Sequence, residues 1–149
     1  MAEISRKELI LALIPSSTKP RMAGLDLSGL DMHRLDMEGA NLRGTNMQTA
    51  NMQETILRST NMTGVNLTGT QMPYADLNAA NLTAANLTLA NLNGARLTGA
   101  QLTNATLNGA NLQGAHLTGA TVHGVKFDEA TTWPDGKKGS QGNPTDYTE

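Results

Sequence analysis

Three histidines, His33, His116 and His123, are the side chains of this chain best suited to metal or proton chemistry. A zinc site built from histidines needs them to converge on one point. The chain has no cysteine, which excludes a disulfide framework and a thiolate metal site. Whether the histidines can converge depends on how the chain between them is folded.

A serine nucleophile would need a histidine and an acid converging on it. Ser28 and Ser59 fall in the regular pattern of the chain and show no such grouping. The glycines are spaced evenly and are not clustered as in a phosphate-binding loop. These residues therefore predict a protein that is not an enzyme and has no catalytic residues, no cofactor and no metal site.

A five-residue period organises the elements that carry these side chains. Alanine stands at every fifth position from Ala75 to Ala120, and a leucine follows two residues after each alanine up to Ala115. A period of five fits neither the 3.6 residues of a helix nor the two of a strand. A chain that turns identically in every repeat winds into a solenoid.

One apolar residue occupies the centre of every quintet from position 27 to position 127, without an insertion. The six methionines among these residues are expected to be adaptable packing groups rather than ligands. We predict that the central residues form a thin structural core: Leu27, Met32, Met37, Leu42, Met47, Met52, Leu57, Met62, Leu67, Met72, Leu77, Leu82, Leu87, Leu92, Leu97, Leu102, Leu107, Leu112, Leu117, Val122 and Phe127.

The recurring pattern Ala-(Asp/Asn)-Leu-x-x resembles the pentapeptide repeat family, over about 105 of the 149 residues. The resemblance implies an all-β solenoid, a right-handed quadrilateral β-helix of about five coils with four repeats in each coil. It also implies that the central residue and the residue two before it point inward. The other three residues of each quintet would face solvent.

Charged residues offer a separate test of a coil of 20 residues. Residues 20 apart would then stack at about the strand spacing of 4.8 Å. Opposite charges are favourable at that distance and like charges are not. Three opposite pairs and no like pair have this separation within the repeats: Arg34 with Glu54, Glu38 with Arg58, and Asp76 with Arg96.

The last residue of the quintet is often glycine, which adopts the positive φ of a type II turn without strain. Pro73 falls one position before such a corner and Tyr74 follows it. We therefore expect a different turn type at Tyr74.

Residues 1–20 are expected to form an N-terminal capping helix, over residues 1–14, and a connector. Ser5 and Glu8 have the spacing of a capping box, and Pro15 is expected to end the helix. Three leucines replace the small inward residue in the first coil and are expected to pack beneath this helix: Leu25, Leu30 and Leu35.

Residues 21–129 are expected to form the repeat β-helix, and residues 130–149 a C-terminal cap and a disordered tail. Phe127 and Trp133 are predicted to plug the open coil. The polar, glycine-bearing stretch 137–149 is predicted to be disordered.

The net charge of −2 gives no electrostatic case for direct binding to nucleic acid or to an anionic membrane. The longest apolar run, residues 9–14, is too short to span a bilayer, so a cytoplasmic location is expected. In the predicted solenoid His33 lies about 20 Å from the other two histidines, which excludes a three-histidine zinc site.

Some pentapeptide repeat proteins resemble B-DNA and protect or inhibit DNA gyrase by occupying its DNA site. Such a role requires acidic faces, whereas Arg96 is the one formally charged residue between Asp76 and Lys126. The acidic residues gather in the first coil: Asp26, Asp31, Asp36 and Glu38. A DNA-mimicking modulator of gyrase is therefore the alternative reading, with DNA gyrase as a disfavoured partner.

The favoured function is a rigid interaction scaffold or spacer whose partner is another protein of unknown identity, with the chain itself a monomer. Ice binding is a minor alternative, because a regular threonine array can match ice, although surface strands favour threonine anyway. Two vertical files of threonine are expected on the surface: Thr63, Thr83 and Thr103, and Thr68 with Thr88.

Overall fold

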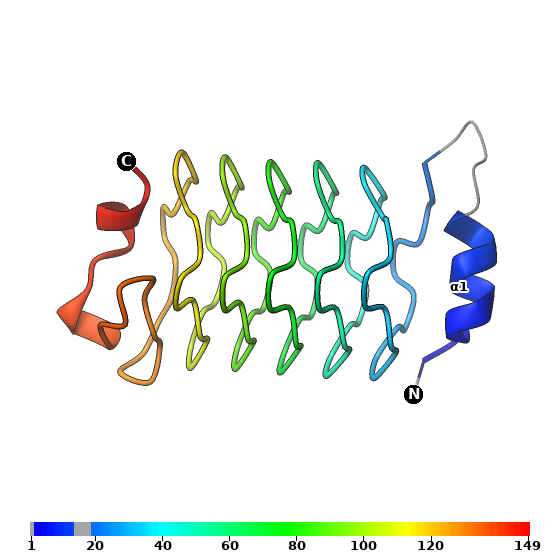
Figure 1. The fold of residues 1–149 in the computed structure, drawn as a ribbon, viewed down its shortest axis with the longest axis horizontal. Coiled ribbons are helices and arrows are strands. Elements are labelled where there is room, and N and C mark those ends of the chain that lie inside the picture. Colours follow the sequence, from blue (N-terminus) through cyan, green and yellow to red (C-terminus); the bar gives the residue numbers. More distant parts are fainter. Residues whose placement is uncertain (1, 14–18) are drawn as a thin grey trace.

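The computed structural model describes residues 2–13 and 19–149 and shows a stack of similar coils with a helix at one end (Figure 1). Parallel β-bridges join residues 20 positions apart, from the Arg21–Asn41 pair to the Thr106–Lys126 pair. Bridged positions recur every five residues, so four ladders run along the stack. The chain is a β-helix solenoid whose coil takes 20 residues. Among the described residues the pairing consists of isolated bridges rather than longer strands.

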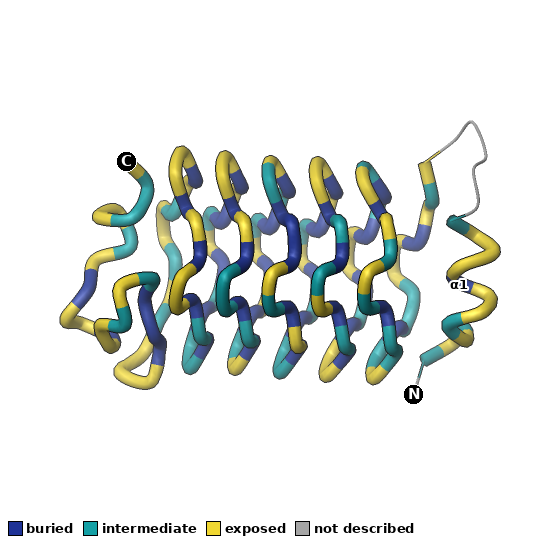
Figure 2. The backbone as a smooth tube through the Cα atoms, viewed as in Figure 1, coloured by how far each residue is buried: buried dark blue, intermediate teal, exposed yellow. Residues whose placement is uncertain are grey.

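Two inward positions in each quintet fill the interior (Figure 2). Every central residue from Leu27 to Leu117 is buried. Val122 and Phe127 are only partly buried and pack against the C-terminal end of the core. The residue two before the centre is also buried, from Ala40 to Ala120. A narrow column accepts one large and one small residue per quintet because protein interiors pack densely.

Threonine replaces alanine at several of the small inward positions. Thr45, Thr60 and Thr70 each donate a hydroxyl hydrogen bond to the carbonyl three residues earlier, at 2.7–2.8 Å. Thr55 donates instead to the carbonyl of Met32 at 2.9 Å. Since an unpaired buried hydroxyl is costly, these bonds explain why a polar residue is tolerated in this column.

The corner residue of each quintet from Gly24 to Gly124 adopts a positive φ, whether or not it is glycine. At Tyr74 φ is 59°, and Ala75 N–H donates to the carbonyl of Met72 at 3.2 Å, as at the other corners. The expectation of a different turn at Tyr74 is therefore wrong. The ladder bonds on both sides of the corner impose the same backbone and override the preference of the side chain.

Helix α1 (Arg6–Leu13) covers the N-terminal end of the stack (Figure 1). The capping box forms, because Ser5 N–H donates to Glu8 Oε2 at 2.7 Å and Glu8 N–H to Ser5 Oγ at 3.3 Å. Leu9 is fully buried. Leu25, Leu30 and Leu35 are partly buried against the core at this end. Pro15, expected to end the helix, lies outside the described residues.

Helix α1 has only eight residues. Within the ranges 2–13 and 19–149, no helix combines the length and apolar character needed to cross a membrane.

The C-terminal segment is ordered, which corrects the prediction of disorder for residues 137–149. It forms two short 3-10 helices, η1 (Gly139–Gln141) and η2 (Pro144–Tyr147). Trp133 is buried, and its Nε1–H donates to the carbonyl of Gly139 at 2.7 Å. Tyr147 stacks on Trp133 with ring centroids 5.8 Å apart. The packing of these two aromatic rings explains why the segment is ordered although most of its residues are polar.

Candidate binding groove and outer surface

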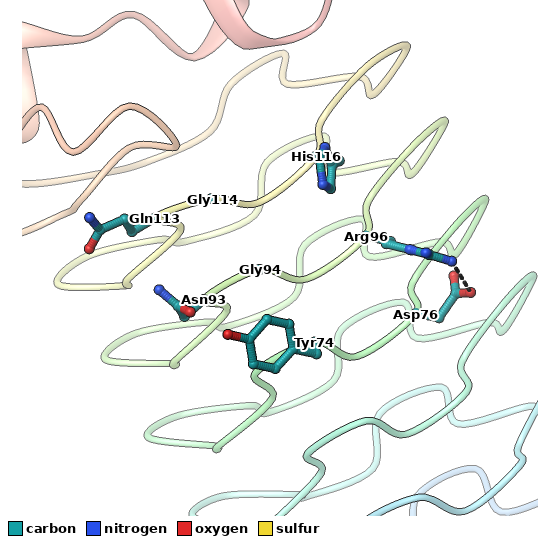
Figure 3. Close-up of a pocket in the computed structure, with 8 residues that line it drawn as sticks. All are labelled: Tyr74, Asp76, Asn93, Gly94, Arg96, Gln113, Gly114 and His116. Carbon is teal, nitrogen blue, oxygen red and sulfur yellow. Dashed lines mark ion pairs between the residues drawn. The ribbon is translucent and has the colours of Figure 1, made fainter.

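A groove of about 660 Å³ runs along one corner of the solenoid (Figure 3). Its floor is formed by Gly94 and Gly114, which are corner residues of two successive coils. Tyr74, the corner residue one coil earlier, stands at one end. Because both floor residues are glycines, neither has a side chain of its own that projects into the groove.

Two rows of polar side chains flank this floor. Asn93 and Gln113 lie on one side. Asp76, Arg96 and His116 lie on the other and are consecutive members of one bridge ladder. The predicted stacking of Asp76 with Arg96 is therefore confirmed, and His116 continues the same column at a separation of about 4.8 Å along the rod.

The carboxylate of Asp76 is held mainly by Arg58, whose Nε–H donates to Oδ2 at 2.8 Å. Arg96 Nη1 is 3.9 Å from the same oxygen. Glu38 and Arg58 stack in the predicted register, since Gly39 N–H donates to the carbonyl of Arg58 at 2.8 Å, but the guanidinium of Arg58 pairs with Asp76 rather than with Glu38. Asp76 is largely buried whereas Glu38 is exposed, so pairing with Asp76 compensates a larger loss of hydration.

The predicted pair of Arg34 and Glu54 is confirmed, with Arg34 Nε 2.8 Å from Glu54 Oε2. The hydrogen bond from Arg34 lowers the pKa of Glu54 and raises that of Arg34. Both side chains are well exposed, so this pair reports the spacing of the coils rather than adding much stability.

The histidines have different surroundings in the fold. His33 Nδ1 lies 2.7 Å from Asp31 Oδ1, and this hydrogen bond lowers the pKa of Asp31. His116 lies in the groove, and His123 is exposed near the C-terminal end. In the part of the chain that the structure describes, no three histidine, aspartate or glutamate side chains are grouped as metal ligands.

An asparagine ladder is the structural feature that sequence reasoning missed. Asn66 Oδ1 accepts from the N–H of Thr68 at 3.1 Å, and its Nδ2–H donates to Asn46 Oδ1 at 3.2 Å. Asn46 in turn donates to Asp26 Oδ1 at 3.2 Å. Asparagine can accept within its own corner and donate to the coil before it, whereas aspartate can only accept. The recurrence of Asn or Asp before most of the central residues was the available signal.

Some surface threonines also serve these corners. The hydroxyls of Thr63, Thr68 and Thr88 donate to the asparagine two residues earlier at 2.6–2.9 Å. These bonds orient the hydroxyls toward the backbone turn. These three threonines of the predicted files therefore have a structural role.

Two large apolar side chains, Tyr74 and Leu89, are exposed at corner positions, by 62% and 63%. Both have a positive φ, and the corner one coil later is glycine in each case. Sequence reasoning did not single them out as a surface. Their departure from the small residues common at this position was the signal that could have done so.

Comparison with known proteins gives consistent matches. The family model described as pentapeptide repeats matches residues 21–58, 60–99 and 95–131, with eight copies. The crystal structure of the pentapeptide repeat protein Rfr23 from the cyanobacterium Cyanothece 51142 is 27% identical, with a TM-score of 0.51, covering 84% of this chain and 99% of that one. The pentapeptide repeat protein alr5209 from Nostoc Pcc 7120 is 23% identical, with a TM-score of 0.62, covering 83% and 96%.

A trypsin-treated form of QnrB1, a plasmid-mediated fluoroquinolone resistance protein, is 21% identical and matches with a TM-score of only 0.32. That match covers 73% of this chain and 66% of QnrB1. At this TM-score the likeness carries no argument about function. The comparison with curated proteins gave no match.

Proposed function

Because this chain belongs to the pentapeptide repeat family, we propose that it is a non-enzymatic, rigid scaffold or spacer that binds another protein. The observation that carries the proposal is the unbroken ladder of bridges at a separation of 20 residues. A ladder without insertions holds outward side chains at a repeat of about 4.8 Å along the rod. Such a surface is already organised, so a partner would not have to order it on binding.

The finer description of the rod belongs to this proposal. We infer a right-handed quadrilateral β-helix of about five coils, the form that the resemblance implies. Its parts are a capping helix and connector (1–20), the repeat body (21–129) and a C-terminal cap (130–149). Residues at both ends support a monomer, because covering the ends of a solenoid protects apolar surface and unpaired backbone from end-to-end association. A cytoplasmic location remains a prediction.

The test is a pull-down with the full chain as bait from a lysate of its native source. We expect one partner protein to be retained, and the purified partner to bind the purified chain with a defined stoichiometry in calorimetry. Bait unfolded by heat is the control, because it has the same composition without the ladder. Equal retention by folded and unfolded bait would contradict a scaffold function.

The alternative of a DNA-mimicking gyrase modulator is tested separately. Four of the acidic residues of the rod lie in the first coil, and Asp31 there already accepts hydrogen bonds from His33 and Asn51. We therefore expect DNA gyrase supercoiling to be unchanged at micromolar protein. Inhibition or protection of the enzyme at that concentration would replace the scaffold proposal.

The minor alternative of ice binding makes a separate prediction. The hydroxyls of Thr68 and Thr88 donate to neighbouring asparagines, which supports a structural role for the threonine files. We expect no thermal hysteresis from the purified chain.

A further inference from the structure

We propose that the groove between Tyr74 and His116 binds a short, extended, acidic segment of a partner protein. The inference rests on the proposed interaction function and adds the place and the chemistry of the contact. Its support comes from four features: the shape of the groove, an arginine whose guanidinium donates no hydrogen bond to a described residue, an exposed aromatic ring, and two side-chain amides without hydrogen bonds to described residues.

The shape of the groove suits an extended chain that runs along the rod. Tyr74, Gly94 and Gly114 occupy equivalent corners of three successive coils, so the floor spans about 10 Å at the strand spacing. About three residues of an extended peptide, at roughly 3.3 Å each, have that length. A Cβ atom at Gly94 would lie 2.5 Å from the ring of Tyr74. Because residue 94 is glycine, the ring of Tyr74 can lie close to the backbone along this edge of the groove.

Arg96 supplies the charge that selects an acidic ligand. Its side chain is 64% exposed, and the carboxylate of Asp76 that it approaches is already bound more closely by Arg58. Within the described residues, the Arg96 guanidinium donates no hydrogen bond. Its planar donors are therefore available for two parallel hydrogen bonds to a carboxylate. No lysine or other arginine lies between positions 77 and 125, so this cation is a local feature of the surface.

Tyr74 supplies an apolar contact beside that cation. Its ring is exposed although the residue is in the left-handed region, with φ of 59°. Glycine occupies the same corner in the next two coils and would avoid the strain. The exposed ring can pack against an aromatic or branched side chain of the ligand.

The amides of Asn93 and Gln113 line the opposite wall (Figure 3). Neither side chain makes a hydrogen bond to any residue that the structure describes. An amide both donates and accepts, which matches the alternating N–H and C=O groups of an extended peptide backbone. Because peptide backbone provides both groups in every residue, these two amides can bind the backbone of an extended peptide.

The first experiment uses a random peptide library displayed on phage, selected at low salt against the full-length chain. We expect enriched peptides to carry a glutamate or aspartate within three positions of an aromatic or branched apolar residue. One enriched peptide is then synthesised with a fluorophore and titrated by fluorescence anisotropy. Its binding is expected to weaken as the salt concentration rises, because the contact with Arg96 is screened.

Variants locate the binding site. Arg96→Gln is expected to weaken the peptide about tenfold or more, the usual effect of losing a charge-assisted hydrogen bond. Tyr74→Gly is expected to weaken it as well while keeping the fold, because glycine stands at that corner in the next coils. The matched control is Arg43→Gln, an exposed arginine that lies more than two coils before Arg96 along the rod. This control is expected to bind the peptide normally.

A library that returns no acidic peptide overturns this proposal, as does an Arg96→Gln variant that binds the peptide as tightly as the unaltered chain. Binding of an oligouronate with no binding of acidic peptides would also overturn it. The pull-down separates the two proposals. A partner retained equally by the unaltered chain and by Arg96→Gln refutes the groove and leaves the scaffold standing. Peptide binding that depends on Arg96, without any partner in the pull-down, supports the groove and refutes the scaffold.

Discussion

The left-handed corners of the solenoid lead to a quantitative prediction about stability. Ala84 occupies a corner with φ of 57° and carries a side chain that a glycine would lack. An L-residue in this region costs about 1–2 kcal/mol, while glycine loses about 0.4–1 kcal/mol more chain entropy on folding than alanine. The difference predicts that Ala84→Gly stabilises the protein by about 0.5–1 kcal/mol.

The reverse change, from glycine to alanine at a corner, is predicted to lower the free energy of unfolding by a similar amount. Gly64 has φ of 64°, and a Cβ atom built there meets no atom within 4 Å. Gly64→Ala therefore changes only the backbone preference and is expected to destabilise by about 0.5–1 kcal/mol. The alanine next to the first site, Ala85, is buried and does not have a positive φ. Ala85→Gly is the matched control and should destabilise by at least about 1 kcal/mol.

Urea unfolding followed by circular dichroism measures these changes. With a slope near 2 kcal/mol per molar urea, the midpoint should shift by roughly 0.3–0.5 M, upward for Ala84→Gly and downward for Gly64→Ala. An unchanged slope is required for reading the shift as stability. If Ala84→Gly lowered the midpoint as Ala85→Gly does, strain at the corners would not limit the stability of this fold.

Three further predictions concern the core, the ladder and the C-terminal cap. Leu87→Ala should destabilise by about 3–5 kcal/mol in urea unfolding, because Leu87 is fully buried, whereas Leu89→Ala should have little effect, because Leu89 is largely exposed. Asn66→Ala should cost about 0.5–1.5 kcal/mol in the same assay through its lost hydrogen bonds, and an unaffected midpoint would refute the role of the ladder. Burial, followed by a hydrogen bond to Asp135, raises the pKa of Tyr147 to about 12. The folded state then holds this proton more tightly than the unfolded state, so stability is full below pH 10 and falls as pH rises from 10 to about 12. Unfolding measured against pH should show this loss, and Tyr147→Phe should remove it.

Particular residues show how far sequence reasoning reaches in a repeat protein. Arg34 and Glu54 meet as predicted because the coils up to residue 126 all take 20 residues. The guanidinium of Arg58 does not pair with Glu38, because a long side chain can reach a more buried carboxylate outside its own column. Periodicity thus predicts where the backbone goes better than it predicts which partner a flexible side chain selects.

The corner residues show the same limit of prediction from sequence. At Tyr74 the local preference of the residues suggested another turn, yet the bonds to adjacent coils impose the common backbone. The asparagine ladder and the order of the C-terminal segment were also missed. Both depend on contacts between segments that the sequence separates, such as the stacking of Tyr147 on Trp133.

By itself the sequence determined the family, the 20-residue coil and the inward column, because one short pattern repeated in phase permits few ways to bury its leucines. Only the tertiary structure decided which outward side chains gather into a groove and which of their hydrogen-bonding groups remain available. Those properties follow from side-chain contacts between coils and from unequal burial at single corners, which no five-residue pattern specifies.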